Sequence, residues 1–221
     1  MLYIVPTPLG NLEDTTIRAQ KTIEAADFII AENPATTHKL LQLLKLPKKE
    51  VVQFADHNER VVLPKLIERL KTQTACLMSD AGTPGISDPG FRIVRECRAE
   101  GIEVSALPGA SAAITALSAS GLPTDKFLFA GFLPKTEVKV TRALQEAKQI
   151  KATLVAYDSP QRIIKTLGFI HGAFPEAQVV VARELTKMHE EYLHGTAIQL
   201  LETLKTRASI KGEITLLVSF K

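Results

Sequence analysis

The 221-residue sequence contains two cysteines, no tryptophan and only 5% aromatic residues. Cys76 and Cys97 form no C-x-x-C motif, and no histidines stand at metal-ligand spacing, so we expect a reduced protein without a bound metal. No apolar run approaches the roughly 20 residues of a membrane span, and no basic leader precedes the opening residues. These absences predict a cytoplasmic, soluble protein without a membrane partner.

Glycine-rich phosphate-binding motifs are also missing. Neither G-x-G-x-x-G nor G-x-x-x-x-G-K-[ST] occurs, which argues against ordinary dinucleotide or ATP binding. The net charge of +3 is too small to indicate an anionic partner by itself. With 45% hydrophobic residues, the chain is long enough for one large or two small domains with a substantial core.

Short apolar runs alternate with amphipathic segments along the whole chain, which is typical of an α/β fold. Strands are expected at residues 2–5, 27–31, 51–54, 74–79, 102–107, 127–132, 153–157, 179–183 and 214–220. Helices are expected from residue 14 or 15 onward and at 37–44, 63–70, 89–99, 111–120, 137–148, 160–169 and 197–205. The turn-rich connector at 121–125 predicts two α/β domains, at 1–120 and 121–221.

The most informative segment is the loop at 79–90, with sequence SDAGTPGISDPG, which follows a predicted strand. Its glycines permit close backbone approach, its prolines stiffen the turns, and Asp80 and Asp88 can accept hydrogen bonds. Turn-rich segments at 6–12, 108–111 and 157–160 also follow predicted strands. Ligands of open α/β sheets bind at this edge, so the four segments predict a polar ligand site.

These segments, together with Gly131-Phe132-Leu133-Pro134, residues 118–125, 182–187 and 211–213, resemble the tetrapyrrole methylase superfamily. The similarity covers nearly the whole chain and is greatest to the branch that methylates a cytidine ribose 2′-oxygen in small-subunit ribosomal RNA. The resemblance implies two α/β domains with S-adenosylmethionine in the cleft between them, S-adenosylhomocysteine as product, and a homodimer. The RNA partner is either naked or part of an assembled subunit.

The same resemblance implies the cofactor-binding residues. Asp80 is expected to bind the methionine ammonium group, with backbone near Gly82 and Ile86 binding other polar groups. The full expected set is Pro8, Leu9, Asp80, Ala81, Gly82, Ile86, Ser87, Ser111, Ala112, Tyr157, Asp158 and Ala182.

A ribose hydroxyl becomes a good nucleophile only when a nearby group accepts its proton. The candidate catalytic residues are Glu32, Glu184 and Lys187, with His57 a weaker candidate, and the sequence does not select among them. Glu184 and Lys187 are three residues apart, so a helical turn would place both on one face, where they could pair with each other or contact RNA. Phosphate contacts are expected from five basic residues, Lys135, Lys139, Arg142, Lys148 and Lys151.

One departure from the family pattern keeps other functions open. Members usually read Ala-Glu-Asp-Thr-Arg-His-Thr, whereas this chain has Asn33 and Ala35 in place of the acid and the arginine. This departure leaves open a catalytically silent cofactor-binding protein. Within the same fold, a further alternative is a carbon methyltransferase for a corrin or porphyrin precursor. The carbon methyltransferase alternative lacks support because residues 6–12 do not contain the glycine-rich loop usual in that branch.

Overall fold

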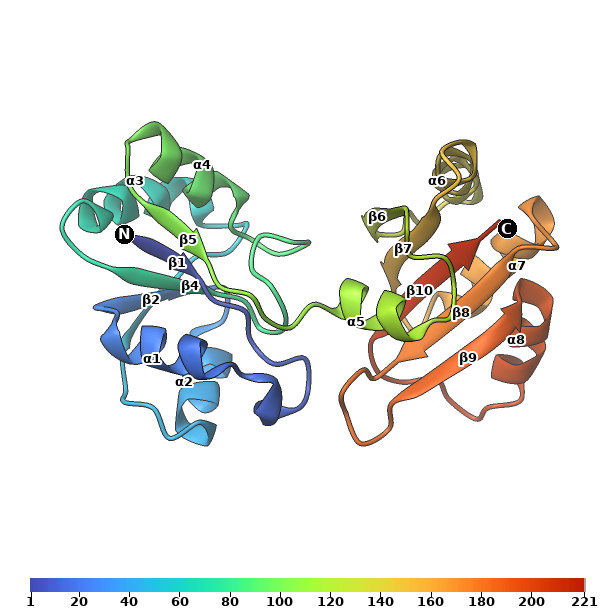
Figure 1. Cartoon of the computed structure of the whole chain (residues 1–221), viewed down its shortest axis with the longest axis horizontal. Coiled ribbons are helices and arrows are strands. Elements are labelled where there is room, and N and C mark those ends of the chain that lie inside the picture. Colours follow the sequence, from blue (N-terminus) through green and yellow to red (C-terminus); the bar gives the residue numbers. More distant parts are fainter. Residues whose placement is uncertain (221) are drawn as a thin grey trace. The chain divides into compact units, whose positions relative to one another are not determined.

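A computed structural model describes residues 1–220 of the chain. The chain forms two compact units, Met1–Ser111 and Ala112–Lys221. Each unit contains a five-stranded sheet covered by helices (Figure 1). The α/β class expected from the sequence is thus confirmed.

The first unit contains a fully parallel sheet. Its strands are β1 (Leu2–Ile4), β2 (Phe28–Ala31), β3 (Glu50–Gln53), β4 (Ala75–Met78) and β5 (Val104–Ala106). They lie in the order β3-β2-β4-β1-β5. The connecting segments are the 3-10 helix η1 (Leu12–Asp14), α1 (Ile17–Ala25), α2 (Pro34–Leu43), α3 (Glu59–Leu70) and α4 (Phe91–Ala99).

Alternating strand residues of this unit face two separate cores. Phe28 and Ile30 pack with α3 and α4, whereas Ile29 and Ala31 pack with α1 and α2, so two helices cover each face (Figure 1). The chain leaves β1 toward β2 and leaves β4 toward β5, in opposite directions. The strand order therefore reverses between β1 and β4, and such a switch point is where α/β sheets bind ligands.

The second unit has a mixed sheet in the order β6-β7-β10-β8-β9, in which only β6 and β7 pair in parallel. Its strands are β6 (Phe127–Phe132), β7 (Thr153–Asp158), β8 (Gln178–Arg183), β9 (Glu191–Thr196) and β10 (Ile214–Ser219). Its helices are α5 (Ala112–Ala119), α6 (Glu137–Gln149), α7 (Ile163–Ala173) and α8 (Ala197–Lys205). Helices α6, α7 and α8 share one apolar core with the sheet.

Two features differ from the sequence-based expectations. Helix α5, which the expected boundary at 120/121 assigned to the first domain, packs on β7 and β10, so the second compact unit begins at Ala112. Its buried small residues Ala113 and Ala116 permit this close packing. Strand β9 was not expected, because its sequence EYLHGT has little apolar character and contains Gly195.

Candidate functional site

Three loops at the carboxyl ends of β1, β4 and β5 are joined by hydrogen bonds. Thr7 and Gly82 exchange backbone bonds of 2.9 and 3.0 Å across the switch point. The Thr7 hydroxyl donates to the Ser79 carbonyl at 3.0 Å, and the Thr83 hydroxyl donates to the Ala110 carbonyl at 2.9 Å. The segments at 6–12, 79–90 and 108–111 therefore form one structure, as expected from their positions after strands.

Glycines allow these loops to approach each other. Gly82 has φ +83°, and a Cβ there would stand 3.4 Å from Leu9. A Cβ on Gly109 would stand only 2.7 Å from the Pro6 side chain. Since Leu9 and Pro8 are half-buried and Ile86 and Ser87 are exposed, the loops offer both apolar and polar surface beside the switch point.

Acidic side chains gather at the same edge. Burial raises the pKa of Glu32, which follows β2, and the charges of Asp80 and Asp56 add to the effect. Burial, with Glu32 and Asp80 nearby, raises the pKa of Asp88 to about 6. Burial also raises the pKa of Asp80, although a hydrogen bond from Asn33 opposes this. A cationic ligand would relieve this repulsion, so the charge of the site suits an ammonium or sulfonium group.

The sequence named Glu32 and Asp80 as site residues and named Asp88 only as a hydrogen-bond acceptor of the ligand loop, outside the expected cofactor set. The signal was present, because Asp88 lies in the same 79–90 loop. Seven residues of chain separate it from Asp80, and only the folded loop, in which Gly85 and Gly90 adopt positive φ, brings the two carboxylates close enough to interact.

Asn33 has a clear local function. Its side-chain oxygen accepts hydrogen bonds from the amides of Ala35 and Thr36 at 3.1 and 3.4 Å and so caps α2. An aspartate could make the same cap. The departure at position 33 therefore preserves the helix start while removing one negative charge from an edge that already holds Glu32, Asp80 and Asp88.

The expected cofactor residues of the second unit lie at the ends of β7 and β8. Tyr157 is half-buried, whereas Asp158 is 4% exposed and accepts hydrogen bonds from Arg162 and the Ser159 amide. Within residues 1–220 the second oxygen of Asp158, Oδ2, is buried without a hydrogen-bond partner. Ala182 is fully buried in β8 between β9 and β10, so its side chain offers no surface to a ligand.

Glu184 and Lys187 pair with each other, as one of the two possibilities weighed from their spacing. Lys187 Nζ lies 2.9 Å from both Glu184 Oε1 and Glu213 Oε2, and the Glu213 amide also donates to Glu184. The Lys187 hydrogen bond lowers the pKa of Glu184. A Cβ on Gly212 would stand 2.4 Å from Glu184, so the local chain is built around this carboxylate. The arrangement favours a structural role over proton abstraction.

The five basic residues expected to contact RNA are spread along α6 and the residues that flank it. Lys135 and Lys139 are exposed near its start, and Arg142 pairs with Glu146. Lys148 near its end lies 4.9 Å from the centre of the Phe174 ring. Thirteen residues of helix span about 20 Å, so the set does not form one compact cluster.

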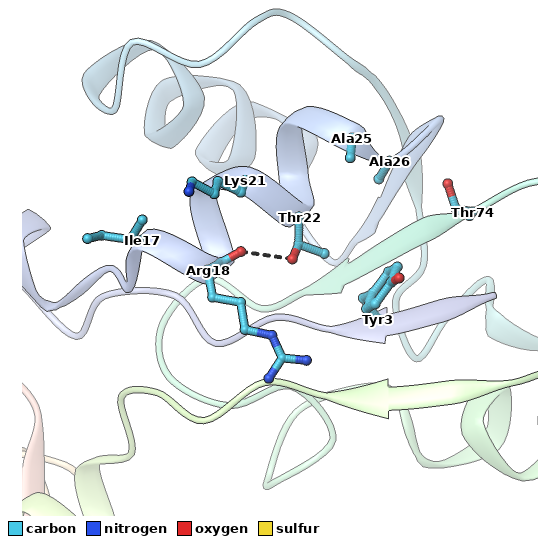
Figure 2. Close-up of a pocket in the computed structure, with 8 residues that line it drawn as sticks. All are labelled: Tyr3, Ile17, Arg18, Lys21, Thr22, Ala25, Ala26 and Thr74. Carbon is cyan, nitrogen blue, oxygen red and sulfur yellow. Dashed lines mark hydrogen bonds between the residues drawn. The ribbon is translucent and has the colours of Figure 1, made fainter.

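A shallow pocket of about 470 Å³ lies along α1 in the first unit (Figure 2). It is lined by Tyr3, Ile17, Arg18, Lys21, Thr22, Ala25, Ala26 and Thr74. Ala26 and Thr74 precede β2 and β4, at the opposite edge of the sheet from the carboxylates. Because the pocket contains none of the expected site residues and no acidic group, it is separate from the candidate ligand site.

Neither a metal-binding cluster nor a membrane-spanning helix is found in the part of the chain that the structure describes. Among residues 1–220, no group of three or more histidine, cysteine, aspartate and glutamate side chains could hold a metal ion. No helix in that range is long and apolar enough to cross a membrane.

Comparison with known proteins places the chain in a class. The family model described as Tetrapyrrole (Corrin/Porphyrin) Methylases matches residues 1–201. The chain therefore belongs to the tetrapyrrole methylase family, as its motifs indicated.

Curated relatives point to one branch of that family. Proteins named ribosomal RNA small subunit methyltransferase I are similar to this chain in Halalkalibacterium halodurans (45% identity; 98% of this chain, 75% of the relative) and Hydrogenobaculum sp. (43%; 99% and 95%). The protein of that name in Thermotoga maritima is 39% identical, with 100% of this chain and 98% of the relative covered.

Solved structures share the fold at low sequence identity. A diphthine synthase aligns with a TM-score of 0.77 at 17% identity, covering 99% of this chain and 89% of that one. A Thermus thermophilus uroporphyrin-III C-methyl transferase complexed with S-adenyl homocysteine aligns with a TM-score of 0.65 at 14% identity, covering 99% and 97%. These similarities confirm the two-unit architecture.

Proposed function

We propose that this protein transfers a methyl group from S-adenosylmethionine to the 2′-oxygen of a cytidine ribose in small-subunit ribosomal RNA. The observation that carries the proposal is the acidic edge of the first unit, where Glu32, Asp80 and Asp88 lie close enough to interact and their combined negative charge suits a cation. The name shared by the curated relatives supports the RNA substrate. The reaction would take place in the cytoplasm, on naked or assembled RNA.

The cofactor supplies, when bound, a methyl group that is already activated by its sulfonium. Asp80 would bind the ammonium group, and the backbone at Ala81, Gly82 and Ile86 would bind the remaining polar groups of the methionine portion. Pro8 and Leu9 would contact its apolar parts. Ser111, Ala112 and Tyr157 are further residues that the family resemblance assigns to cofactor binding, whereas Asp158 would act through Arg162 as a positioning residue.

Glu32 is the best candidate for the base that accepts the ribose hydroxyl proton. Its raised pKa makes its carboxylate a stronger proton acceptor than an ordinary glutamate. Glu184 is the weaker candidate because Lys187 and the Glu213 amide already bind its carboxylate and lower its pKa. The Glu32 carboxylate must be ionised to act, so the rate should rise with pH through its pKa.

The test compares Glu32→Gln with Glu184→Gln, using labelled methyl transfer to small subunits from cells that lack this protein. Glu32→Gln should lower kcat by about 10²- to 10⁴-fold, the usual contribution of a general base. Calorimetry should show that Glu32→Gln still binds the cofactor, with affinity lowered by much less than kcat because Asp80 and Asp88 keep their carboxylates. Glu184→Gln should mainly lower stability. Full activity of Glu32→Gln, with loss of activity in Glu184→Gln, would identify Glu184 rather than Glu32 as the base.

The same assay separates the two alternatives. A silent cofactor-binding protein would bind S-adenosylmethionine in the calorimeter without labelling any RNA. A corrin or porphyrin precursor methyltransferase would label such a precursor and leave the RNA unlabelled. Failure to bind the cofactor at all would overturn the proposal.

A further inference from the structure

An aromatic side chain stands exposed at the end of an edge strand in the second unit. Phe132, the last residue of β6, is 65% exposed, which is unusual for so large an apolar group. Its ring makes an edge contact with Tyr157, with centroids 5.5 Å apart and planes at 65°. Phe129 contacts the same tyrosine at 5.1 Å. The sheet thus gathers three of the few aromatic rings in the sequence at one place.

The backbone fixes the position of this ring. The pairing of β6 with β7 shifts register between Phe129 and Phe132, where Gly131 adopts φ +62°. Immediately beyond, the Leu133 amide donates to the Tyr157 carbonyl at 3.0 Å, and Arg162 donates to the Leu133 carbonyl at 2.9 Å. A ring held by its neighbours loses little conformational entropy when it binds a flat partner.

Positive charge lies next to the ring along the chain. Lys135 and Lys139 are exposed, and within residues 1–220 neither makes an ion pair or a hydrogen bond through its side chain. The nearby Arg142, by contrast, pairs with Glu146. An exposed aromatic ring followed within seven residues by unpaired ammonium groups is complementary to single-stranded nucleic acid, which presents a base face and phosphates together.

We propose that Phe132 stacks on an unpaired base of the RNA substrate, while Lys135 and Lys139 bind the adjoining phosphates. The proposal rests on the proposed function and assigns the second unit a part in substrate binding. Tyr157, one of the expected cofactor residues, supports the ring from the side. A base stacked on Phe132 would therefore lie close to Tyr157 within the second unit.

The absence of tryptophan from the chain provides a direct probe. Phe132→Trp introduces a single tryptophan whose fluorescence is quenched when a base stacks on it. Phe127→Trp is the matched control, since Phe127 is 41% exposed at the other end of the same strand. Titration with protein-free small-subunit ribosomal RNA should quench the probe at 132 and leave the probe at 127 nearly unchanged. Equal quenching at both positions would contradict the proposal.

A second experiment removes the ring. Phe132→Ala should weaken RNA binding by about 10-fold or more, as expected for loss of one stacked base, with unchanged cofactor affinity. Phe132→Tyr should restore binding, because a tyrosine ring also stacks. The double substitution Lys135→Ala and Lys139→Ala should reduce the salt dependence of RNA binding. Wild-type RNA affinity of Phe132→Ala, or a loss of cofactor affinity in it, would overturn the assignment.

The outcomes also separate this inference from the proposed function. Methyl transfer to RNA with no effect of any Phe132 variant would reject only the stacking role. Quenching at position 132 without methyl transfer would reject the proposed reaction but support the RNA-binding role of Phe132. If wild type neither binds nor methylates the RNA, both fail.

Discussion

At the scale of single residues, the carboxyl edge of the first sheet holds acidic side chains that are both partly buried and close to one another, which disfavours their ionised forms. Glu32, Asp80 and Asp88 repel one another, and burial further disfavours their ionised forms. Such unfavourable groups persist in proteins where a ligand compensates for them. Because the pKa of Asp88 is raised to about 6, this repulsion and burial should make the free energy of unfolding depend on pH.

Unfolded Asp88 titrates near 3.8 and folded Asp88 near 6, so between these values the folded chain holds a proton that the unfolded chain has released. By linkage, this group's contribution to stability is present at low pH and is lost as pH rises through about 6. We expect Asp88→Asn to be more stable than wild type at pH 7.5, with the difference shrinking toward pH 4.

Urea unfolding at several pH values measures the effect. Asp14→Asn, at an exposed aspartate of η1, serves as the control and should show no such pH-dependent gain. A constant difference between Asp88→Asn and wild type from pH 4 to 7.5 would contradict the assigned pKa.

At the scale of elements, β9 shows how a strand can depend on tertiary contacts. Its first residue, Glu191, accepts hydrogen bonds from Arg183 of β8 at 2.5 Å and from Arg207, which follows α8. The Arg207 hydrogen bond, reinforced by Arg183, lowers the pKa of Glu191 to about 2. The carboxylate therefore connects β9 to the neighbouring strand and to the end of the following helix.

We expect Glu191→Gln to destabilise the protein at pH 7 by about 1–3 kcal/mol, the usual range for charged hydrogen bonds. Because the folded pKa lies below the unfolded value of 4.5, the stabilisation is present above pH 4.5 and is lost as pH falls toward 2. The difference in free energy of unfolding between wild type and variant, measured by urea unfolding, should therefore decrease as the pH falls from 5 to 3. A difference that stays constant or widens on acidification would show that Glu191 acts in another way.

At the scale of the whole molecule, both units expose large apolar side chains. Val61 and Phe91 in the first unit are 76% and 68% exposed, and Val138 and Met188 in the second are 79% and 93% exposed. Exposed apolar groups mark an interface where they form a contiguous patch, which a second copy of the chain would cover. They agree with the homodimer that the family resemblance implies, which stays a prediction.

Light scattering after size-exclusion chromatography should give twice the mass of one chain at micromolar concentration. Phe91→Asp and Met188→Asp, tested one at a time, would shift the equilibrium toward single chains if their side chains lie in the interface. A single-chain mass for wild type over a wide concentration range would exclude a stable homodimer.

The sequence by itself determined the α/β class, most strand positions and the loops that follow β1 and β4, because these depend on local periodicity and on turn residues such as Gly82 and Pro84. It also pointed to Glu32 and Asp80, since both directly follow apolar strands. The tertiary structure alone decided what depends on contacts between distant segments. Helix α5 belongs to the second unit because the small residues Ala113 and Ala116 fit the face of β7 and β10. Asp88 interacts with Glu32 because its loop folds back. The Glu184 carboxylate is held in hydrogen bonds because Lys187 and the amide of Glu213, which is distant in the sequence, reach it.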